Sequence, residues 1–115
     1  MRLVFTPHGW DDHTYWLTAD RATLQRINRL IDDALRHPTS GVGKPEPLRH
    51  LLAGAWSRRI GEEHRLVYLV DGDDLVILQV GRHDLAVDVG ERHAEVLGLR
   101  AGVAAGHVRV SERRR

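Results

Sequence analysis

Apolar residues recur at helical spacing in the first third of the chain. Five of them fall mostly three or four positions apart: Leu24, Ile27, Ile31, Ala34 and Leu35. This spacing places one apolar stripe along an amphipathic helix. Its start signal lies at Thr18 or Asp20, and Pro38 followed by Thr-Ser-Gly ends it. The pattern therefore predicts one helix that begins after Thr18 or Asp20 and ends before Pro38.

A shorter helix is predicted just before this one, over residues 8–18. Its large side chains also recur at helical spacing: Trp10, His13 and Leu17. Thr6 and Pro7 fit an N-cap residue followed by proline at the first helical position. Residues 3–5, Leu-Val-Phe, favour β structure and form a candidate first strand.

The pattern changes from helices to strands in the second half of the chain. Three short runs are rich in Val, Leu, Ile, Tyr and Trp, at residues 55–60, 64–70 and 75–80. Tight turns at residues 61–63 and 71–74 separate them. Consecutive strands joined by turns this short pair antiparallel. If the first strand joins them, the fold is α+β: two N-terminal helices packed on a small antiparallel sheet.

Composition narrows the classes of partner. A chain of 115 residues most simply forms one domain. With 17 Lys and Arg against 16 Asp and Glu the net charge is +1, so a nucleic-acid surface has to be local. The absence of Cys excludes disulfides and fits a reducing cytosol. No apolar run matches a transmembrane helix or a signal peptide, and we expect a cytoplasmic protein that binds no membrane.

Residues 43–68 carry the candidate chemistry and read GKPEPLRHLLAGAWSRRIGEEHRLVY. Pro45 and Pro47 fix the backbone on both sides of Glu46, which predicts an extended, stiff segment. Between residues 44 and 65, five Lys or Arg and three Glu give a formal charge of +2. One carboxylate on a stiff loop beside several guanidinium groups suits proton abstraction next to a phosphate.

Three motifs in this stretch carry a family resemblance. GKPEPL, WSRRI and EEHRLVY resemble the YoeB branch of the RelE toxin superfamily, and the similarity runs without a gap from about residue 10 to residue 75. The resemblance implies a RelE-like, microbial-RNase-like fold and an endonuclease that cleaves mRNA in the ribosomal A site. It also implies a homodimer, a YefM-like antitoxin that neutralises the toxin, and operator DNA bound only through the antitoxin complex.

Cutting RNA without a metal needs a base for the 2′-hydroxyl, a cation for the transition state and an acid for the leaving 5′-oxygen. Glu46 is the candidate base, because a glutamate with a pKa of about 4.3 is ionised at neutral pH. The alternative is an ordinary surface glutamate. Arg65 is the candidate phosphate clamp, with an ion pair to a nearby glutamate as the alternative. His83 is the candidate acid, since its pKa of about 6.5 suits proton donation and it matches the family's penultimate histidine.

Four further cations are candidate ligands for RNA phosphates: Lys44, Arg49, Arg58 and Arg59. Arg58 and Arg59 are neighbours on a predicted strand, so one points toward the helices and the other toward the groove. Arg59 matches the family's substrate-binding arginine. Arg49 stands where relatives usually carry lysine, an exchange that keeps a phosphate contact.

We expect neither a metal nor another cofactor. The sequence has eight histidines, but none lies in an HExxH motif or another compact ligand spacing. It also lacks a Ser-His-Asp order and a phosphate-cradling glycine loop. The predicted reaction therefore depends on amino-acid side chains alone.

The chain departs from the family pattern at residues 81–84. These read Gly-Arg-His-Asp, where family members commonly end in Arg-Tyr-His-Tyr, and a one-residue shift would move His83 off the catalytic position. We expect a toxin domain over residues 1–84 and a loosely ordered extension over residues 85–115. The altered end keeps a second function open, a catalytically weakened homologue that acts mainly as an antitoxin-binding transcriptional co-repressor.

Overall fold

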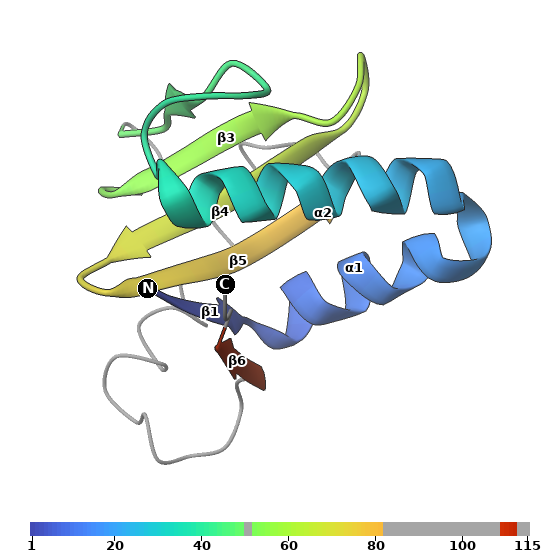
Figure 1. The fold of residues 1–115 in the computed structure, drawn as a ribbon, viewed down its shortest axis with the longest axis horizontal. Helices are drawn as coiled ribbons and strands as arrows, with labels where there is room; N and C mark the ends of the chain where they lie inside the picture. The colour runs from blue at the N-terminus through green and yellow to red at the C-terminus, as the bar shows by residue number, and fades with distance from the viewer. Residues whose placement is uncertain (50–51, 82–108, 113–115) are drawn as a thin grey trace.

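Two helices lie against one face of a mixed sheet (Figure 1). The computed structural model describes residues 1–49, 52–81 and 109–112. Within them, the elements in chain order are β1 (Arg2–Phe5), α1 (Pro7–Ala19), α2 (Arg21–Arg36), β2 (Glu46–Pro47), β3 (Ala55–Arg59), β4 (Arg65–Asp71), β5 (Asp74–Gly81) and β6 (Arg109–Glu112). The strands form one sheet in the order β2-β3-β4-β5-β1-β6. This arrangement confirms the predicted α+β fold.

The start of α1 is held tightly against β5. The Thr6 hydroxyl oxygen accepts a hydrogen bond from the Gly9 amide (3.0 Å) and its proton is donated to the Ile77 carbonyl (3.1 Å). Pro7 occupies the first turn, as predicted. A Cβ atom at Gly9 would collide with the Ile77 carbonyl oxygen, so only glycine allows this approach. The N-cap therefore fixes both the start of the helix and its distance from the sheet.

The second helix begins after Asp20, one of the two predicted start points. The Asp20 carboxylate accepts hydrogen bonds from the amides of Ala22 and Thr23 and from the Thr23 hydroxyl. These bonds, the one from the Thr23 hydroxyl first, lower the pKa of Asp20. Four buried residues form the inner stripe: Ile27, Leu30, Ile31 and Ala34. The helix ends at Arg36, before Pro38.

The predicted antiparallel meander of β3, β4 and β5 is confirmed, with strand ends that differ by about one residue. The first strand also joins the sheet, and it runs parallel to β5, from Arg2 opposite Asp74 to Phe5 opposite Ile77. Parallel neighbours need a long crossover connection, and α1 and α2 lie within it. The sheet is therefore mixed.

Apolar side chains pack on both faces of the sheet. The helix-side cluster joins strand residues such as Leu66, Tyr68 and Ile77 to the inner stripe of α2. The cluster on the opposite face contains Val4, Leu48, Leu52, Ala55, Val67, Leu69, Val76 and Leu78. Leu48 and Leu52 come from the segment between β2 and β3, so packing on this face anchors the chain just after Glu46.

Part of the predicted extension belongs to the sheet. Strand β6 pairs antiparallel with β1, with Arg109 opposite Phe5 and Glu112 opposite Arg2. The sequence analysis predicted no strand there. The expected loose order of residues 85–108 and 113–115 lies outside the described residues. Within the described part, no helix is both long enough and apolar enough to span a bilayer.

Candidate active site

The strand register places Glu46 on the sheet face opposite the helices. Glu46 lies opposite Ser57, Ser57 opposite Val67, and Val67 opposite Gln79. Residues directly opposite each other on neighbouring strands point to the same face. Because Val67 belongs to the apolar cluster away from the helices, Glu46 also faces that way. Its side chain is exposed, and β2 is extended there as predicted.

Two arginines share this face in the next row of the sheet. Arg59 lies opposite Arg65, which lies opposite Gly81, and each is two positions along its strand from the Glu46 row. Since side chains alternate with a period of two, Arg59 and Arg65 point the same way as Glu46. Two strand spacings and one row separate the Cα atoms of Glu46 and Arg65 by roughly 12 Å. A glutamate and an arginine side chain are together long enough to span that separation with one phosphate between them.

Arg65 is half-buried and bonded to backbone only. Its guanidinium donates to the carbonyl oxygens of Gly61 (3.0 Å) and His64 (3.2 Å). Among the described residues it has no ion pair with Glu62 or Glu63, the alternative raised by the sequence. Its positive charge therefore remains available to an anionic ligand.

A turn with left-handed backbone angles leads into β2. Gly43 has φ +84° and Lys44 has φ +53°, a conformation that costs energy for a residue with a Cβ. The Gly43 carbonyl accepts a hydrogen bond from the Arg59 amide (2.7 Å). The turn therefore brings the backbone next to the exposed Lys44 into contact with Arg59 on β3.

Arg58 does not lie on the sheet face that carries Glu46, and its predicted role as a phosphate ligand is wrong. Its side chain is fully buried on the helix side, with 0% exposed. Its guanidinium donates to Asp33 Oδ2 (2.6 Å) and to the Tyr68 hydroxyl (2.9 Å). It also donates to three loop carbonyls, those of His37 (2.6 Å), Ser40 (2.8 Å) and Val42 (3.0 Å). These contacts leave no donor for RNA.

Two side chains that hold Arg58, those of Asp33 and Tyr68, were not predicted from the sequence. The Val42 amide, followed by Arg58, lowers the pKa of Asp33, and burial raises the pKa of Tyr68. The Tyr68 hydroxyl donates to the Pro38 carbonyl (2.6 Å). A signal for this pairing did exist, because a guanidinium that faces the helices needs a carboxylate partner on them.

We predict that Asp33 makes stability dependent on acidity. Its folded-state pKa lies below the ordinary value of 3.8, so its stabilising contribution is present above that pH. The contribution is lost as pH falls through the folded-state pKa. Asp33→Asn should therefore be less stable than the native chain at neutral pH, and the gap should narrow below about pH 4. Urea unfolding across this range, with Asp11→Asn as an exposed control, measures it.

The positions of two further predicted residues are only partly defined. Arg49 is exposed and directly follows the buried Leu48, on the segment that leaves β2. His83, the predicted acid, lies outside the described residues. Gln79 was not singled out from the sequence, yet it is fully buried in the Glu46 row, and its amide atoms have no hydrogen-bond partner among the described residues.

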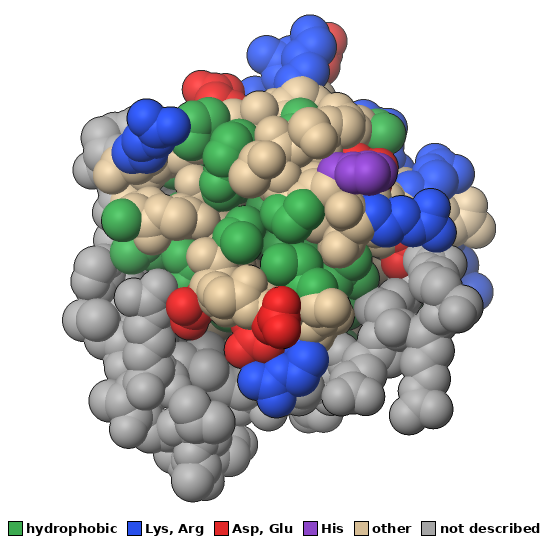
Figure 2. All heavy atoms as spheres, turned by 60° about the vertical axis from the view of Figure 1, so that its left-hand side comes forward, with side chains coloured by type: hydrophobic (Ala, Val, Ile, Leu, Met, Phe, Trp, Pro, Cys, Tyr) green, Lys and Arg blue, Asp and Glu red, His purple; other side chains and the backbone are tan. Residues whose placement is uncertain are grey.

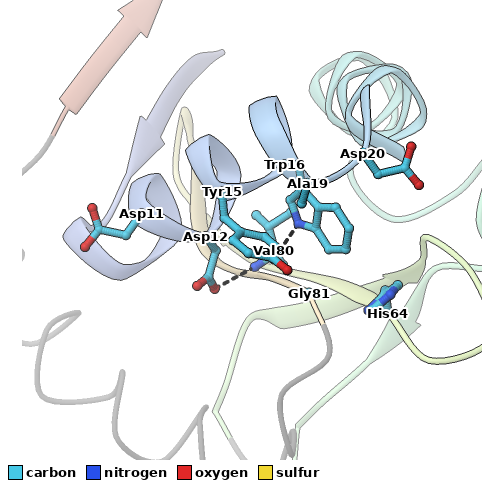
Figure 3. Close-up of a pocket in the computed structure, with 9 residues that line it drawn as sticks. All are labelled: Asp11, Asp12, Tyr15, Trp16, Ala19, Asp20, His64, Val80 and Gly81. Carbon is cyan, nitrogen blue, oxygen red and sulfur yellow. Dashed lines mark hydrogen bonds between the residues drawn. The ribbon is translucent and has the colours of Figure 1, made fainter. Parts of the chain in front are cut away.

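A pocket of about 450 Å³ lies on the helix side, between α1 and the ends of β4 and β5 (Figure 3). Its lining consists of Asp11, Asp12, Tyr15, Trp16, Ala19, Asp20, His64, Val80 and Gly81. Trp16 Nε1 donates to the Val80 carbonyl (3.2 Å), and Asp12 accepts from the Val80 amide (3.0 Å). None of the predicted site residues that the structure describes lines this pocket, and its carboxylates would repel RNA phosphates.

On one face of the molecule, charged side chains lie in separate groups (Figure 2). Figure 2 shows Lys and Arg side chains standing apart around the rim of one face, with hydrophobic side chains gathered near its centre. This distribution fits the net charge of +1. The described residues contain no group of three or more His, Asp or Glu that could hold a metal ion.

Comparison with known proteins identifies the family. Residues 5–84 match the model of the YoeB-like toxin of bacterial type II toxin–antitoxin systems. The chain is 55% identical to Toxin YoeB of Streptomyces coelicolor and 51% identical to Toxin YoeB of Escherichia coli K12. Each match extends over 83 residues, which is 72% of this chain and 99% of the relative.

Solved structures agree with this match. A YoeB/ParE toxin from Agrobacterium tumefaciens superimposes with a TM-score of 0.70 at 46% identity, over 73% of this chain and 100% of the other. YoeB of Staphylococcus aureus, solved as a dimer and as a heterotetramer with YefM, gives 0.66 at 37% identity, over 71% of this chain and 95% of the other. The chain therefore belongs to the family of YoeB-like toxins of bacterial type II toxin–antitoxin systems.

Proposed function

We propose that this chain is an endoribonuclease that cleaves mRNA in the ribosomal A site without a metal ion. One observation carries the proposal: the strand register brings Glu46, Arg59 and Arg65 to the same sheet face in adjacent rows. A carboxylate beside two guanidinium groups matches what attack by a 2′-hydroxyl on the adjacent phosphate requires.

In the proposed reaction Glu46 removes the proton of the 2′-hydroxyl. The freed oxygen attacks phosphorus, the bond to the 5′-oxygen breaks, and His83 donates a proton to that leaving oxygen. Arg65 and Arg59 stabilise the extra negative charge on the phosphate oxygens in the transition state. The products are a 2′,3′-cyclic phosphate and a 5′-hydroxyl end. Lys44 and Arg49, both exposed, add positive charge beside Glu46.

The proposed partners are the ribosome with its mRNA, a YefM-like antitoxin and a second copy of the chain. The Staphylococcus aureus relative was solved both as a dimer and with YefM, which supports the last two. The separate groups of basic side chains fit a toxin that the ribosome helps to dock. Operator DNA would be bound only through the antitoxin complex, and the setting for all these partners is the cytoplasm.

A second function has one observation in its favour. Residues 81–84 read Gly-Arg-His-Asp, so an aspartate stands where the family commonly ends in tyrosine. An aspartate cannot stack on a base, and its charge opposes the phosphate. The alternative is a weakened homologue that binds the antitoxin and acts mainly as a transcriptional co-repressor.

Primer extension on mRNA bound to programmed ribosomes separates the two functions. The proposed nuclease should cut within the A-site codon and leave a cyclic phosphate, and it should leave the same mRNA intact when ribosomes are omitted. Intact mRNA on ribosomes, together with tight antitoxin binding by the same preparation, would favour the co-repressor.

A further inference from the structure

The buried guanidinium of Arg58 is bonded mainly to one loop. Three of its five hydrogen bonds go to carbonyl oxygens between His37 and Val42. The other two go to Asp33 on α2 and Tyr68 on β4, and both of these side chains also bond the loop themselves. Asp33 accepts from the Val42 amide (2.9 Å), and Tyr68 donates to the Pro38 carbonyl. We call Arg58, Asp33 and Tyr68 the Arg58 network.

This loop leads directly to the proposed base. Val42, the last loop residue that the network holds, is followed by Gly43, whose carbonyl pairs with the Arg59 amide. Lys44 then turns the chain with its positive φ, and Glu46 pairs with Ser57. Val42, which the network holds, precedes Glu46 by only four positions.

The strand that carries Glu46 has little means of holding itself in place. It is two residues long, and Pro45 and Pro47 on either side of Glu46 have no amide hydrogen to donate. After it, Leu48 is anchored through its amide to the Ala55 carbonyl (2.8 Å) and through burial. Before it, the chain is anchored by the bond between the Gly43 carbonyl and the Arg59 amide and, one residue earlier, by the Arg58 network.

We propose that Arg58, Asp33 and Tyr68 are positioning residues that set the place of Glu46 opposite Arg65. This inference rests on the proposed function, in which Glu46 is the base. A buried ion pair is often no more stabilising than apolar side chains of similar volume. Stability alone therefore does not explain why a buried pair of Arg58 and Asp33 is present. A guanidinium differs from apolar side chains because its N–H groups point in fixed directions and so fix the positions of their acceptors. Here they hold the loop on the buried side of β3 while Glu46 emerges on the other side.

Tyr68→Phe is the test variant, because it removes two hydrogen bonds of the network and keeps the aromatic ring in the core. Displacing a base by about 1 Å lowers a rate by up to about a hundredfold. We expect the maximal rate on saturating ribosomes to fall between about tenfold and a hundredfold, with little change in the ribosome concentration at half-maximal rate. Amide hydrogen exchange should accelerate in residues 37–47.

Ile27→Val is the matched control, since Ile27 is fully buried in the helix-side cluster and takes no part in the hydrogen bonds of the network. It should weaken the fold without changing the rate or the exchange of residues 37–47. Equal losses of rate in the two variants would show that the network only stabilises the fold and has no specific role in positioning Glu46. Asp33→Asn serves as a second test variant if Tyr68→Phe does not fold.

The exchange measurement keeps this inference distinct from the proposed function. If Glu46→Gln abolishes cleavage but Tyr68→Phe cleaves at the native rate, the positioning role is overturned while the proposed function stands. If Glu46→Gln cleaves as well as the native chain, the proposed function fails and the positioning role falls with it. Unchanged exchange in residues 37–47 of Tyr68→Phe would overturn the ordering role directly.

Discussion

Glu46→Gln is expected to lower cleavage of ribosome-bound mRNA by about 10²- to 10⁴-fold, the usual loss when a positioned base is removed. The free energy of unfolding should change by less than about 0.5 kcal/mol, because the side chain is exposed and glutamine has the same shape. Single-turnover cleavage on programmed ribosomes and urea unfolding measure the two quantities. Growth arrest on expression should disappear in the same variant.

Glu62→Gln provides the matched control for this change. Glu62 is also an exposed glutamate, in the turn between β3 and β4, so the substitution removes the same charge from the protein. It should retain most of the native rate. Native cleavage by Glu46→Gln would exclude Glu46 as the base. Equal losses in both variants would point to a general effect of net charge.

The neighbouring arginines of β3 should differ in their effect on stability, because Arg58 is buried and Arg59 is exposed. Arg58→Met removes a fully buried cation and leaves Asp33 and three carbonyls without their donor. Breaking a buried pair costs about 3–5 kcal/mol, and we expect about 3 because the Asp33 side chain, 23% exposed, can still reach water. For a domain of this size the melting temperature should fall by roughly 12–24 °C.

Arg59→Met, one position further, should leave the fold intact. Arg59 is exposed, so the free energy of unfolding should stay within about 0.5 kcal/mol of the native value. Cleavage should fall by about ten- to a hundredfold, which corresponds to losing one charge-assisted hydrogen bond to phosphate. Thermal melting and cleavage assays on both variants decide the matter. An Arg58→Met variant that melts near the native temperature would contradict the assignment of the two faces.

Local signals were enough to predict most of the fold. Thr6 and Asp20 cap the helices because each side chain accepts hydrogen bonds from amides within the next three residues. Such caps can be predicted from the sequence, because Thr and Asp are typical N-cap residues. The turns between β3, β4 and β5 are short, so the antiparallel order was the only possibility. The parallel pairing of β1 was harder to predict, since its partner is 72 residues away and a four-residue strand carries no register signal.

The candidate site was predictable in part for the same reason. The motif around Glu46 and the strand carrying Arg65 are contiguous in sequence, whereas the fate of Arg58 depends on a distant helix. Alternation along β3 separates the faces of Arg58 and Arg59, and the burial of Arg58 confirms that separation. The alternation of side chains along β3 could not predict that Arg58 would form hydrogen bonds with Asp33 and Tyr68. Those contacts join residues that are far apart in the sequence: Asp33 lies 25 positions from Arg58, and Tyr68 lies 10 positions from it.

The parallel pairing of β1 with β5 also determines the order in which this toxin can assemble during synthesis. Arg2 to Phe5 emerge early, but their partners, from Asp74 to Ile77, are made only after both helices and the Glu46 segment. Closing so long a loop is slow, because the chain loses conformational entropy before the pairing of β1 with β5 stabilises it. Until translation has passed Ile77, the nascent chain has no complete sheet on which to set Glu46 opposite Arg65. Under the proposed function, we therefore expect no cleavage by a nascent chain whose synthesis has not yet passed Ile77.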